Sequence, residues 1–455
     1  MAEKSTTPRE SSEDDLESVK PANVIGVRES NLEGEANPLR RFLKLLGPGV
    51  IVGASDDDPS GIATYAVSGA SLGFSTLWTA LVCLPMMAAV QFMCAKIGLV
   101  TGMGLAGLMR RNFPRLVILP VISLLVIANT INAGADIGAI AASVNLLLPK
   151  LHIISLIIPV SLIILALQVW GSYRMIVNVF KWLSLALLAY IAAAFFAHPK
   201  ASEVLLGTFV PHIRFDATYI TTLVAILGTT ISPYMFFWQT NQEVEEDIEM
   251  GRKALWQRRG TTDTELKYAF WDIGIGMLFS QLVMYFIIMA TAATLFKAGH
   301  THIATAADAA KALEPLAGRG AEFLLALGLI GAGFLAVPIL TGSAGYALSE
   351  TFGWKYGLGE RPDRAPQFYT IIAISTLVGI QMNFMGINAI AALFWTAVIN
   401  GVLAPILLVF IMLIGNNKKI MGKRVNGPTS NIIGWATMAI MTIAAIGLFA
   451  TWGKS

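Results

Sequence analysis

Three consecutive carboxylates lie inside an apolar stretch near the start of the sequence, and they are the residues best suited to chemistry. Asp56, Asp57 and Asp58 are followed directly by a proline. The surrounding residues 43–73 otherwise have the composition of one membrane-spanning segment. Placing a charged side chain near the centre of a bilayer costs from about 3 to more than 10 kcal/mol, so an acidic residue there usually has a function. The sequence therefore predicts a cation site inside the membrane.

The composition indicates that this stretch belongs to a polytopic membrane protein. Of the 455 residues, 55% are hydrophobic and 13% are charged, whereas soluble domains carry about 25% charged residues. The net charge of +3 is small and scattered, which argues against nucleic acid as a partner. Cys83 and Cys94 lie in one apolar segment and are expected to be buried small hydrophobic residues. We expect a protein in the lipid bilayer with no bound cofactor and no obligate protein partner.

The chain divides into a polar tail and a transmembrane domain. Residues 1–42 are rich in Ser, Glu and Asp, and they are predicted to form a disordered cytoplasmic tail without a cleavable signal peptide. Residues 43–455 form the transmembrane domain, in which each apolar segment is near the roughly 20 residues needed to cross a bilayer. We place eleven such segments at 43–73, 75–97, 116–147, 151–170, 174–197, 217–242, 266–297, 321–347, 366–382, 387–414 and 431–451.

The distribution of lysine and arginine predicts the orientation of these segments. The loops after segments 2, 4, 6, 8 and 10 carry most of the basic residues, and the opposite loops carry few. By the positive-inside rule the N-terminus is cytoplasmic, and an odd number of spans leaves the C-terminus extracytoplasmic. We therefore expect an integral protein of the plasma (inner) membrane.

A second interruption lies in the middle of the segment 217–242. Residues 228–234 read Gly-Thr-Thr-Ile-Ser-Pro-Tyr, and a proline removes a backbone donor and unwinds the helix. A single proline in a transmembrane helix usually produces only a kink. Two interrupted helices five spans apart are instead typical of a transporter built from two inverted repeats, with its binding site where the broken helices meet. The repeats would be about 43–197 and 217–414, with 431–451 as an extra helix.

The two interruptions together predict a site for a hard cation. The end of each first half-helix presents unpaired carbonyls and a partial negative charge. Oxygen ligands suit Mg²⁺, Ca²⁺ and Mn²⁺, whereas thioether, thiolate and imidazole draw softer metals. Asp56 and Asp57 either extend the negative approach to this site, cap the second half-helix or face water, and Asn400 either adds an oxygen or links two helices. The candidate ligands are Ser55, Asp57, Asp58, Thr229, Ser232 and Asn400.

The motifs at the two interruptions resemble those of the natural-resistance-associated macrophage protein (NRAMP) family of divalent metal transporters. Residues 58–61, Asp-Pro-Ser-Gly, are similar to the family's usual Asp-Pro-Gly-Asn. Residues 229–234, Thr-Thr-Ile-Ser-Pro-Tyr, are similar to its usual Ala-Thr-Ile-Met-Pro-His. The resemblance extends over the first ten segments. It implies an all-α LeuT-type fold with 11 transmembrane helices, two inverted five-helix repeats, broken helices 1 and 6, and alternating access.

The differences from the family motifs imply an unusual substrate. Asp58 matches the family's metal-binding aspartate, whereas Gly61 stands where the metal-binding asparagine would be. Ser232 replaces the methionine that binds transition metals, and Thr229 replaces an alanine whose carbonyl is a ligand. Gly61 enlarges the metal site, and Mg²⁺ usually keeps several waters when bound. These substitutions resemble the NRAMP-related magnesium transporter branch, which implies Mg²⁺ transport with Mn²⁺ accepted.

The residues expected to carry protons are also replaced. Proton-coupled relatives have a histidine where this chain has Tyr234 and an acidic residue where it has Asn132, while Asp136 lies near a second acidic position. Tyrosine ordinarily titrates near pH 10, so the resemblance favours facilitative transport without proton coupling. The alternatives are a conventional proton-coupled Mn²⁺/Fe²⁺ symporter, with Asp136 as the proton route, and a transporter of organic cations or amino acids with the same fold. No motif of a metalloprotease, a P-loop enzyme or a serine hydrolase is present, so we expect no enzyme.

Overall fold

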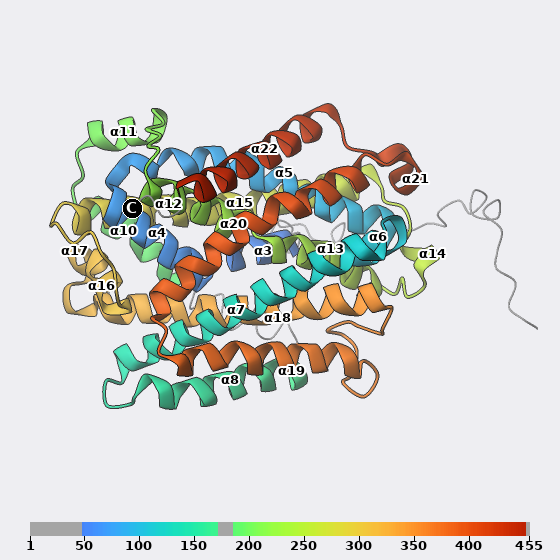
Figure 1. Ribbon diagram of the computed structural model, residues 1–455, viewed down its shortest axis with the longest axis horizontal. Coiled ribbons are helices and arrows are strands. Elements are labelled where there is room, and N and C mark those ends of the chain that lie inside the picture. The colour runs from blue at the N-terminus through green and yellow to red at the C-terminus, as the bar shows by residue number, and fades with distance from the viewer. Residues whose placement is uncertain (1–47, 172–184, 452–455) are drawn as a thin grey trace, which may run out of the picture.

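The structure is a computed structural model that describes residues 48–171 and 185–451, and this part of the chain contains helices and no β-strand. The predicted tail at 1–42 lies outside the described residues, as does the first half of the predicted segment 174–197. In chain order the α-helices are α3 (Pro48–Asp56), α4 (Pro59–Leu72), α5 (Trp78–Thr101), α6 (Leu105–Asn112), α7 (Arg115–Leu147), α8 (Ile153–Trp170), α10 (Ala189–Phe196), α11 (Ala201–Phe209), α12 (Ala217–Thr230), α13 (Pro233–Glu249), α14 (Leu255–Arg258), α15 (Asp263–Thr291), α16 (Ala306–Ala310), α17 (Glu314–Ala317), α18 (Ala321–Phe352), α19 (Pro366–Gln381), α20 (Ala389–Gly415), α21 (Lys418–Met421) and α22 (Pro428–Thr451) (Figure 1).

The long helices agree with the predicted membrane segments. Within the described residues, nine helical stretches are long and apolar enough to cross a membrane, and each corresponds to one predicted segment. Their ends differ from the prediction mostly by a few residues, and the largest extension is that of α13, which continues to Glu249. The two remaining predicted segments are the first, which the structure divides into α3 and α4, and the fifth, of which only the final part with α10 is described.

The short connecting helices gather at the two ends of the bundle. In Figure 1, α6, α14 and α21 lie at one end, and α11, α16 and α17 lie at the other. The first group follows segments 2, 6 and 10, and the second group follows segments 5 and 7, so loops expected on opposite sides of the membrane do lie apart. This arrangement agrees with the predicted alternation of the spans, while the choice of the cytoplasmic side stays a prediction.

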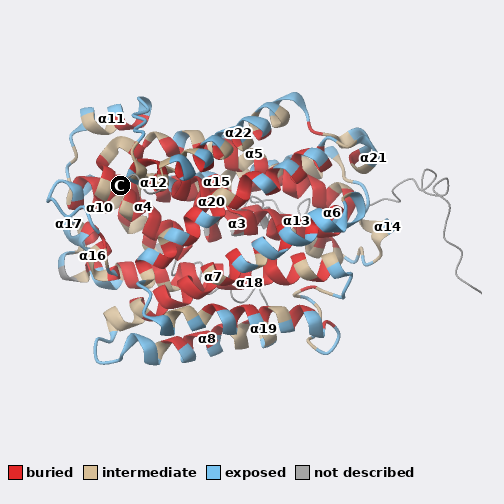
Figure 2. Ribbon diagram, in the orientation of Figure 1, coloured by how far each residue is buried: buried red, intermediate tan, exposed pale blue. Residues whose placement is uncertain are grey.

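The interrupted helices occupy the centre of the bundle. The stretch Ala217–Glu249, which contains the second interruption, is 89% buried, whereas Ile153–Trp170 is 28% buried. Figure 2 shows buried residues concentrated around α3, α12, α13 and α15, and exposed faces along α8, α19 and α22. The exposed faces are apolar, as expected for surfaces that contact lipid tails. The site therefore lies where burial is deepest.

Two glycines bring α3 into direct backbone contact with α15. A β-carbon on Gly53 would lie 2.3 Å from the backbone of Gly276, so no larger residue fits at this crossing. Near the start of α3, the backbone N–H of Gly49 donates to Asp272 on α15 at 2.7 Å. This donor belongs to the first turn of a helix, where N–H groups lack partners within the helix. The close approach positions the end of α3, with its carboxylates, beside the middle of α15.

Candidate metal site

The first interruption is built by Asp58 and the proline that follows it. Helix α3 ends at Asp56 and α4 begins at Pro59, as the sequence predicts. A proline is favourable at the first position of a helix because the N–H it lacks has no partner there. Asp58 is the N-cap of α4, and its Oδ1 accepts hydrogen bonds from the backbone N–H of Gly61 at 2.6 Å and from Ser60 Oγ at 2.7 Å. These bonds fix the orientation of a carboxylate that is 1% exposed.

The second interruption is built by Ser232 and the proline that follows it. Helix α12 ends at Thr230 and α13 begins at Pro233, with extended backbone at Ser232 between them. The Ser232 hydroxyl lies 2.9 Å from the carbonyl oxygen of Gly228 and 2.7 Å from that of Thr229, and it donates to this pair. The interruption leaves these carbonyls without their helical partners. Ser232 therefore lies at the carbonyl end of α12, and its own oxygen keeps lone pairs for a further contact.

Oxygen atoms from both interruptions converge on Gly61. A β-carbon at this position would lie 3.1 Å from Thr229 Oγ1, 3.3 Å from the carbonyl oxygen of Asp56 and 3.4 Å from Asp58 Oδ1. The Thr229 hydroxyl is buried and has no hydrogen-bond partner. The absence of a side chain at Gly61 thus leaves a space no larger than one β-carbon, bordered by a hydroxyl, a carbonyl and a carboxylate, which are the ligand types that hard cations prefer.

Two further helices supply hydrogen-bond donors to the other oxygen of Asp58, and a third orients one of these donors. Asp58 Oδ2 accepts from Asn132 Nδ2 on α7 at 3.3 Å and lies 3.5 Å from the Tyr234 hydroxyl on α13. Thr396 on α20 donates to Asn132 Oδ1 at 2.9 Å, which directs the amide NH₂ group toward Asp58. The Tyr234 hydroxyl also lies 3.5 Å from the carbonyl oxygen of Ser55. The carboxylate is therefore surrounded by neutral donors.

The predicted site residues fall into two groups. Asp58, Gly61 and Thr229 lie together, and the carbonyl of Ser55 approaches the same region through Tyr234. Ser232 reaches this group through the Thr229 carbonyl. The second group consists of Asp57, which contacts α15, and Asn400, which is buried with its Oδ1 unpartnered and has no recorded contact with Asp58. Metal binding by any of these residues stays a prediction.

Several residues around the site were not among the predicted ligands. The carboxylates of the first interruption accept hydrogen bonds from Ser60 and Ser280, and the amide of Asn132 accepts one from Thr396. The sequence indicates Asn132 and Tyr234 only as positions for proton transfer. Each is a polar residue inside an apolar segment, and this pattern is the only sign of their role in the sequence. The pattern does not reveal which neighbouring helix each side chain faces.

The oxygen set suits an ion that keeps part of its water. Within residues 48–171 and 185–451, no group of three or more His, Cys, Asp or Glu side chains is arranged to hold a metal. An ion beside Asp58 would therefore use one carboxylate, neutral oxygens and water. Mg²⁺ is commonly held through one or two carboxylates with several waters retained. Asp136, one turn after Asn132 on α7, is buried and interacts electrostatically with Asp58.

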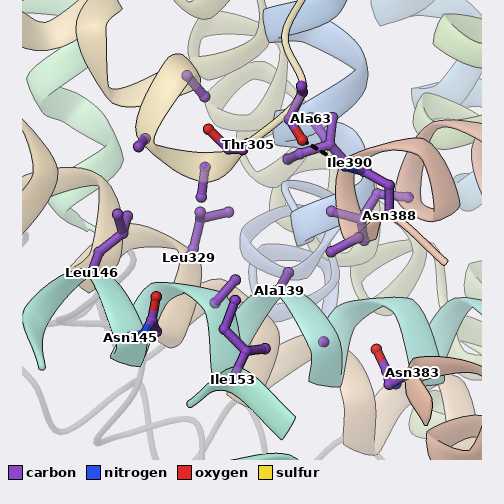
Figure 3. A pocket seen from close by; sticks show the side chains of 18 of the residues that line it. Ala63, Ala139, Asn145, Leu146, Ile153, Thr305, Leu329, Asn383, Asn388 and Ile390 are labelled. Atoms are coloured by element: carbon purple, nitrogen blue, oxygen red, sulfur yellow. Dashed lines mark hydrogen bonds between the residues drawn. The ribbon is translucent and has the colours of Figure 1, made fainter. Parts of the chain in front are cut away.

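A cavity of about 450 Å³ begins next to the first residues of α4. Its wall includes Ile62 and Ala63, which follow Gly61 directly, and it extends toward α16 and the starts of α8 and α20. Figure 3 shows the mixed lining of apolar side chains and neutral polar ones, the latter being Asn145, Thr305, Asn383 and Asn388. The cavity leads from the neighbourhood of the oxygen-lined space toward the end of the bundle that carries α16.

Comparison with known proteins identifies the family. The model of the family described as natural resistance-associated macrophage protein-like matches residues 49–451. The chain belongs to the NRAMP family. Among its relatives, the divalent metal cation transporter MntH of Bacillus subtilis is 27% identical over 92% of this NRAMP chain and 94% of its own length. MntH of Yersinia pestis is also 27% identical, over 91% of this chain and 95% of its own length.

Solved structures show the same fold. A manganese transporter of Eremococcus coleocola, in complex with an aromatic bis-isothiourea compound, superimposes with a TM-score of 0.72 at 18% identity, covering 92% of this NRAMP chain and 88% of the other. Mhp1, a nucleobase-cation-symport-1 family transporter, superimposes with a TM-score of 0.54 at 14% identity, covering 90% and 94%. These likenesses confirm the predicted all-α, LeuT-type fold with two broken helices.

Proposed function

We propose that this NRAMP chain is an integral membrane transporter of divalent metal cations, and that it carries Mg²⁺ by facilitated transport and also accepts Mn²⁺. The observation that carries the proposal is the convergence of Asp58, Thr229 and the Asp56 carbonyl on the space left by Gly61. Transport of divalent metals agrees with the names of the MntH relatives and of the manganese transporter with the same fold. Family membership also sets aside the enzyme and the organic-substrate alternatives.

The choice of Mg²⁺ rests on the ligands that surround Asp58. Ser232 provides a hydroxyl where a thioether would favour softer metals, and it already contacts backbone carbonyls. Because Gly61 has no side chain, we expect a water molecule to contact the ion there in place of an asparagine amide. Mg²⁺ gives up its waters reluctantly, so a site that allows water to remain lowers the cost of binding this ion.

Absence of proton coupling is proposed from the donors around Asp58. Asn132 and Tyr234 are neutral hydrogen-bond donors at positions where a proton carrier would be needed. In a cell, the membrane potential favours entry of a divalent cation by about 4.6 kcal/mol per 100 mV, which is sufficient drive without protons. We place the protein in the plasma (inner) membrane with a cytoplasmic N-terminus and an extracytoplasmic C-terminus, so that the cavity shown in Figure 3 opens to the outside.

A proton-coupled Mn²⁺/Fe²⁺ symporter is the second candidate, and one observation favours it. Asp136 is a buried carboxylate that interacts electrostatically with Asp58. The two candidates differ in a liposome assay that records Mg²⁺ uptake and internal pH together. Facilitated transport predicts Mg²⁺ uptake at an unchanged internal pH, and acidification that follows Mg²⁺ uptake would establish coupling instead.

The role of Asp58 is tested by Asp58→Asn in the same liposomes. Asparagine is as good an N-cap as aspartate, so the variant keeps the helix start, loses the charge and replaces the oxygen that faces Asn132 and Tyr234 by an amide NH₂ group. We expect Mg²⁺ uptake to fall to background while the melting temperature stays close to that of the unmodified chain. The variant Gly61→Asn with Ser232→Met tests selectivity, and it should gain Cd²⁺ and Mn²⁺ uptake relative to Mg²⁺. Robust Cd²⁺ transport by the unmodified chain without Mg²⁺ transport would overturn the proposed substrate.

A further inference from the structure

Asp56 and Asp57 face a different side of the interruption from Asp58. Ser280 on α15 donates a short hydrogen bond to Asp56 Oδ2, and the same hydroxyl lies 3.4 Å from Asp57 Oδ1. The partners of Asp58 belong instead to α4, α7 and α13. The interruption therefore presents carboxylates to two separate surroundings, one on each side of the unwound segment.

The pair that faces α15 lacks the partners a buried charge needs. Both side chains are at most 1% exposed, and Asp56 Oδ1 and Asp57 Oδ2 have no hydrogen-bond partner. The Ser280 hydroxyl has a single proton, so it can satisfy one carboxylate fully but not both. Burying a charge without compensation is expensive, so the pair calls for a ligand that brings positive charge.

A third polar group in the same region is also unsatisfied. The Tyr65 hydroxyl on α4 is fully buried and has no hydrogen-bond partner. It interacts electrostatically with Asp56, Asp57 and Asp58. An oxygen that is buried without a hydrogen-bond partner near carboxylates can bind a cation through its lone pairs.

The balance of charge gives the valence of that ligand. Asp56, Asp57, Asp58 and Asp136 are all buried, and within the described parts of the chain no lysine, arginine or histidine forms an ion pair with any of them. When all four carboxylates are ionised, one divalent cation at Asp58 leaves two negative charges uncompensated. A second divalent cation between the pair would balance them. Two carboxylates, a hydroxyl and retained water are a ligand set that suits Mg²⁺.

We propose that Asp56, Asp57 and Ser280 form a second site for a hydrated Mg²⁺ ion, with the Tyr65 hydroxyl at its edge and separate from the site at Asp58. Two cations held close together repel each other, and multiple occupancy is a known means of allowing an ion to leave a binding site that attracts it. The second site goes beyond the proposed function and does not depend on it, because binding beside α15 requires no transport of the ion at Asp58.

The test counts ions bound to the purified full-length chain. Samples are dialysed to equilibrium against a series of Mg²⁺ concentrations, and bound magnesium is measured by elemental analysis. We expect two ions per unmodified chain, one ion in Asp58→Asn and one ion in the double variant Asp56→Asn with Asp57→Asn. The exposed loop variant Asp363→Asn is the matched control for loss of one carboxylate, and it should keep two ions.

The outcomes distinguish the second site from the proposed function. A single ion in the unmodified chain that the double variant retains would overturn the second site and leave the Asp58 site standing. Loss of one ion in the double variant, together with two ions in Asp58→Asn, would support the second site and overturn the first. Loss of all binding in each variant would mean one shared site and would also overturn the proposal.

A milder variant decides the matter if the double variant does not fold. Ser280→Ala removes one hydroxyl and no charge. We expect it to weaken the second ion by about tenfold, as loss of one contact to a charged group does, and to leave the first ion unchanged. Equal affinities for both ions in Ser280→Ala and the unmodified chain would overturn the role of Ser280 and with it this site.

Discussion

The substitution Gly61→Ala, which adds one methyl group, directly tests the proposed ion site beside Gly61. In Gly61→Ala the new carbon would lie 3.1 to 3.4 Å from the three oxygens that line the space. An ion bound to those oxygens at the Mg²⁺–oxygen distance of about 2.1 Å, or a water between them, would have to share that volume with the methyl group. The variant should therefore bind Mg²⁺ more weakly.

The size of the effect follows from the contact that is lost. Removing one hydrogen-bond-like contact to a charged group costs about 1.5 to 3 kcal/mol, which corresponds to an increase of about 10- to 150-fold in the Mg²⁺ concentration that gives half-maximal uptake. The fold should tolerate the change, because Gly61 lies in α4 without a positive φ, where alanine is preferred over glycine by about 0.5 to 1 kcal/mol. Weaker transport is thus expected, and because crowding by the new carbon opposes this backbone preference, the melting temperature should change only slightly.

The assay is Mg²⁺ uptake into liposomes over a range of concentrations, with thermal unfolding of the same preparation. Gly274→Ala is the matched control, since a β-carbon there would meet nothing within 4 Å. We expect the control to transport as the unmodified chain does. If Gly61→Ala takes up Mg²⁺ with unchanged concentration dependence, the oxygens around Gly61 do not bind the ion. That result would refute the argument from these oxygens to Mg²⁺ as the substrate.

Two further substitutions test the surroundings of the site. Thr396→Val removes the hydroxyl that orients the Asn132 amide toward Asp58. Loss of one neutral hydrogen bond costs about 0.5 to 1.5 kcal/mol, so the Mg²⁺ concentration that gives half-maximal uptake should rise by about 2- to 10-fold while the maximal rate is preserved. A fall in the maximal rate alone would contradict this prediction. Gly53→Val places a side chain where a β-carbon already lies 2.3 Å from the backbone of Gly276, so the melting temperature should fall by several degrees, as overpacking typically costs about 1 to 3 kcal/mol. An unchanged melting temperature would show that α3 and α15 do not meet this closely.

The fold was largely predictable because the bilayer imposes strong constraints on sequence. A spanning helix needs about 20 apolar residues, and any polar or proline-containing interruption stands out against that background. Both interruptions were predicted from Asp58-Pro59 and Ser232-Pro233, and both appear at those residues. The ends of the helices were less predictable, because α13 continues to Glu249 through a polar stretch in which apolar length gives no signal.

The composition of the site was only partly predictable. Residues within one interruption lie near each other in sequence, so Asp58 and Gly61 could be grouped at once. The contacts between helices follow from rotation and crossing of helices that the sequence does not encode locally. Asp56 and Asp57 illustrate this limit, since they precede Asp58 directly but face Ser280, more than 220 positions later in the chain.

The donors around Asp58 explain how a buried carboxylate can remain available to a passing ion. A lysine or arginine in contact with Asp58 would compensate its charge, but an arriving cation would then have to break a buried ion pair, which is costly because it leaves the displaced charge without a partner. Here the carboxylate accepts hydrogen bonds from Ser60, the Gly61 N–H and Asn132 instead. Two carboxylate oxygens offer about four acceptor positions, so at least one remains for a cation. Neutral donors therefore hold Asp58 in place without competing with its substrate. The same logic applies to Asp56 and Asp57, because Ser280 is also a neutral donor and each carboxylate keeps one oxygen without a hydrogen-bond partner.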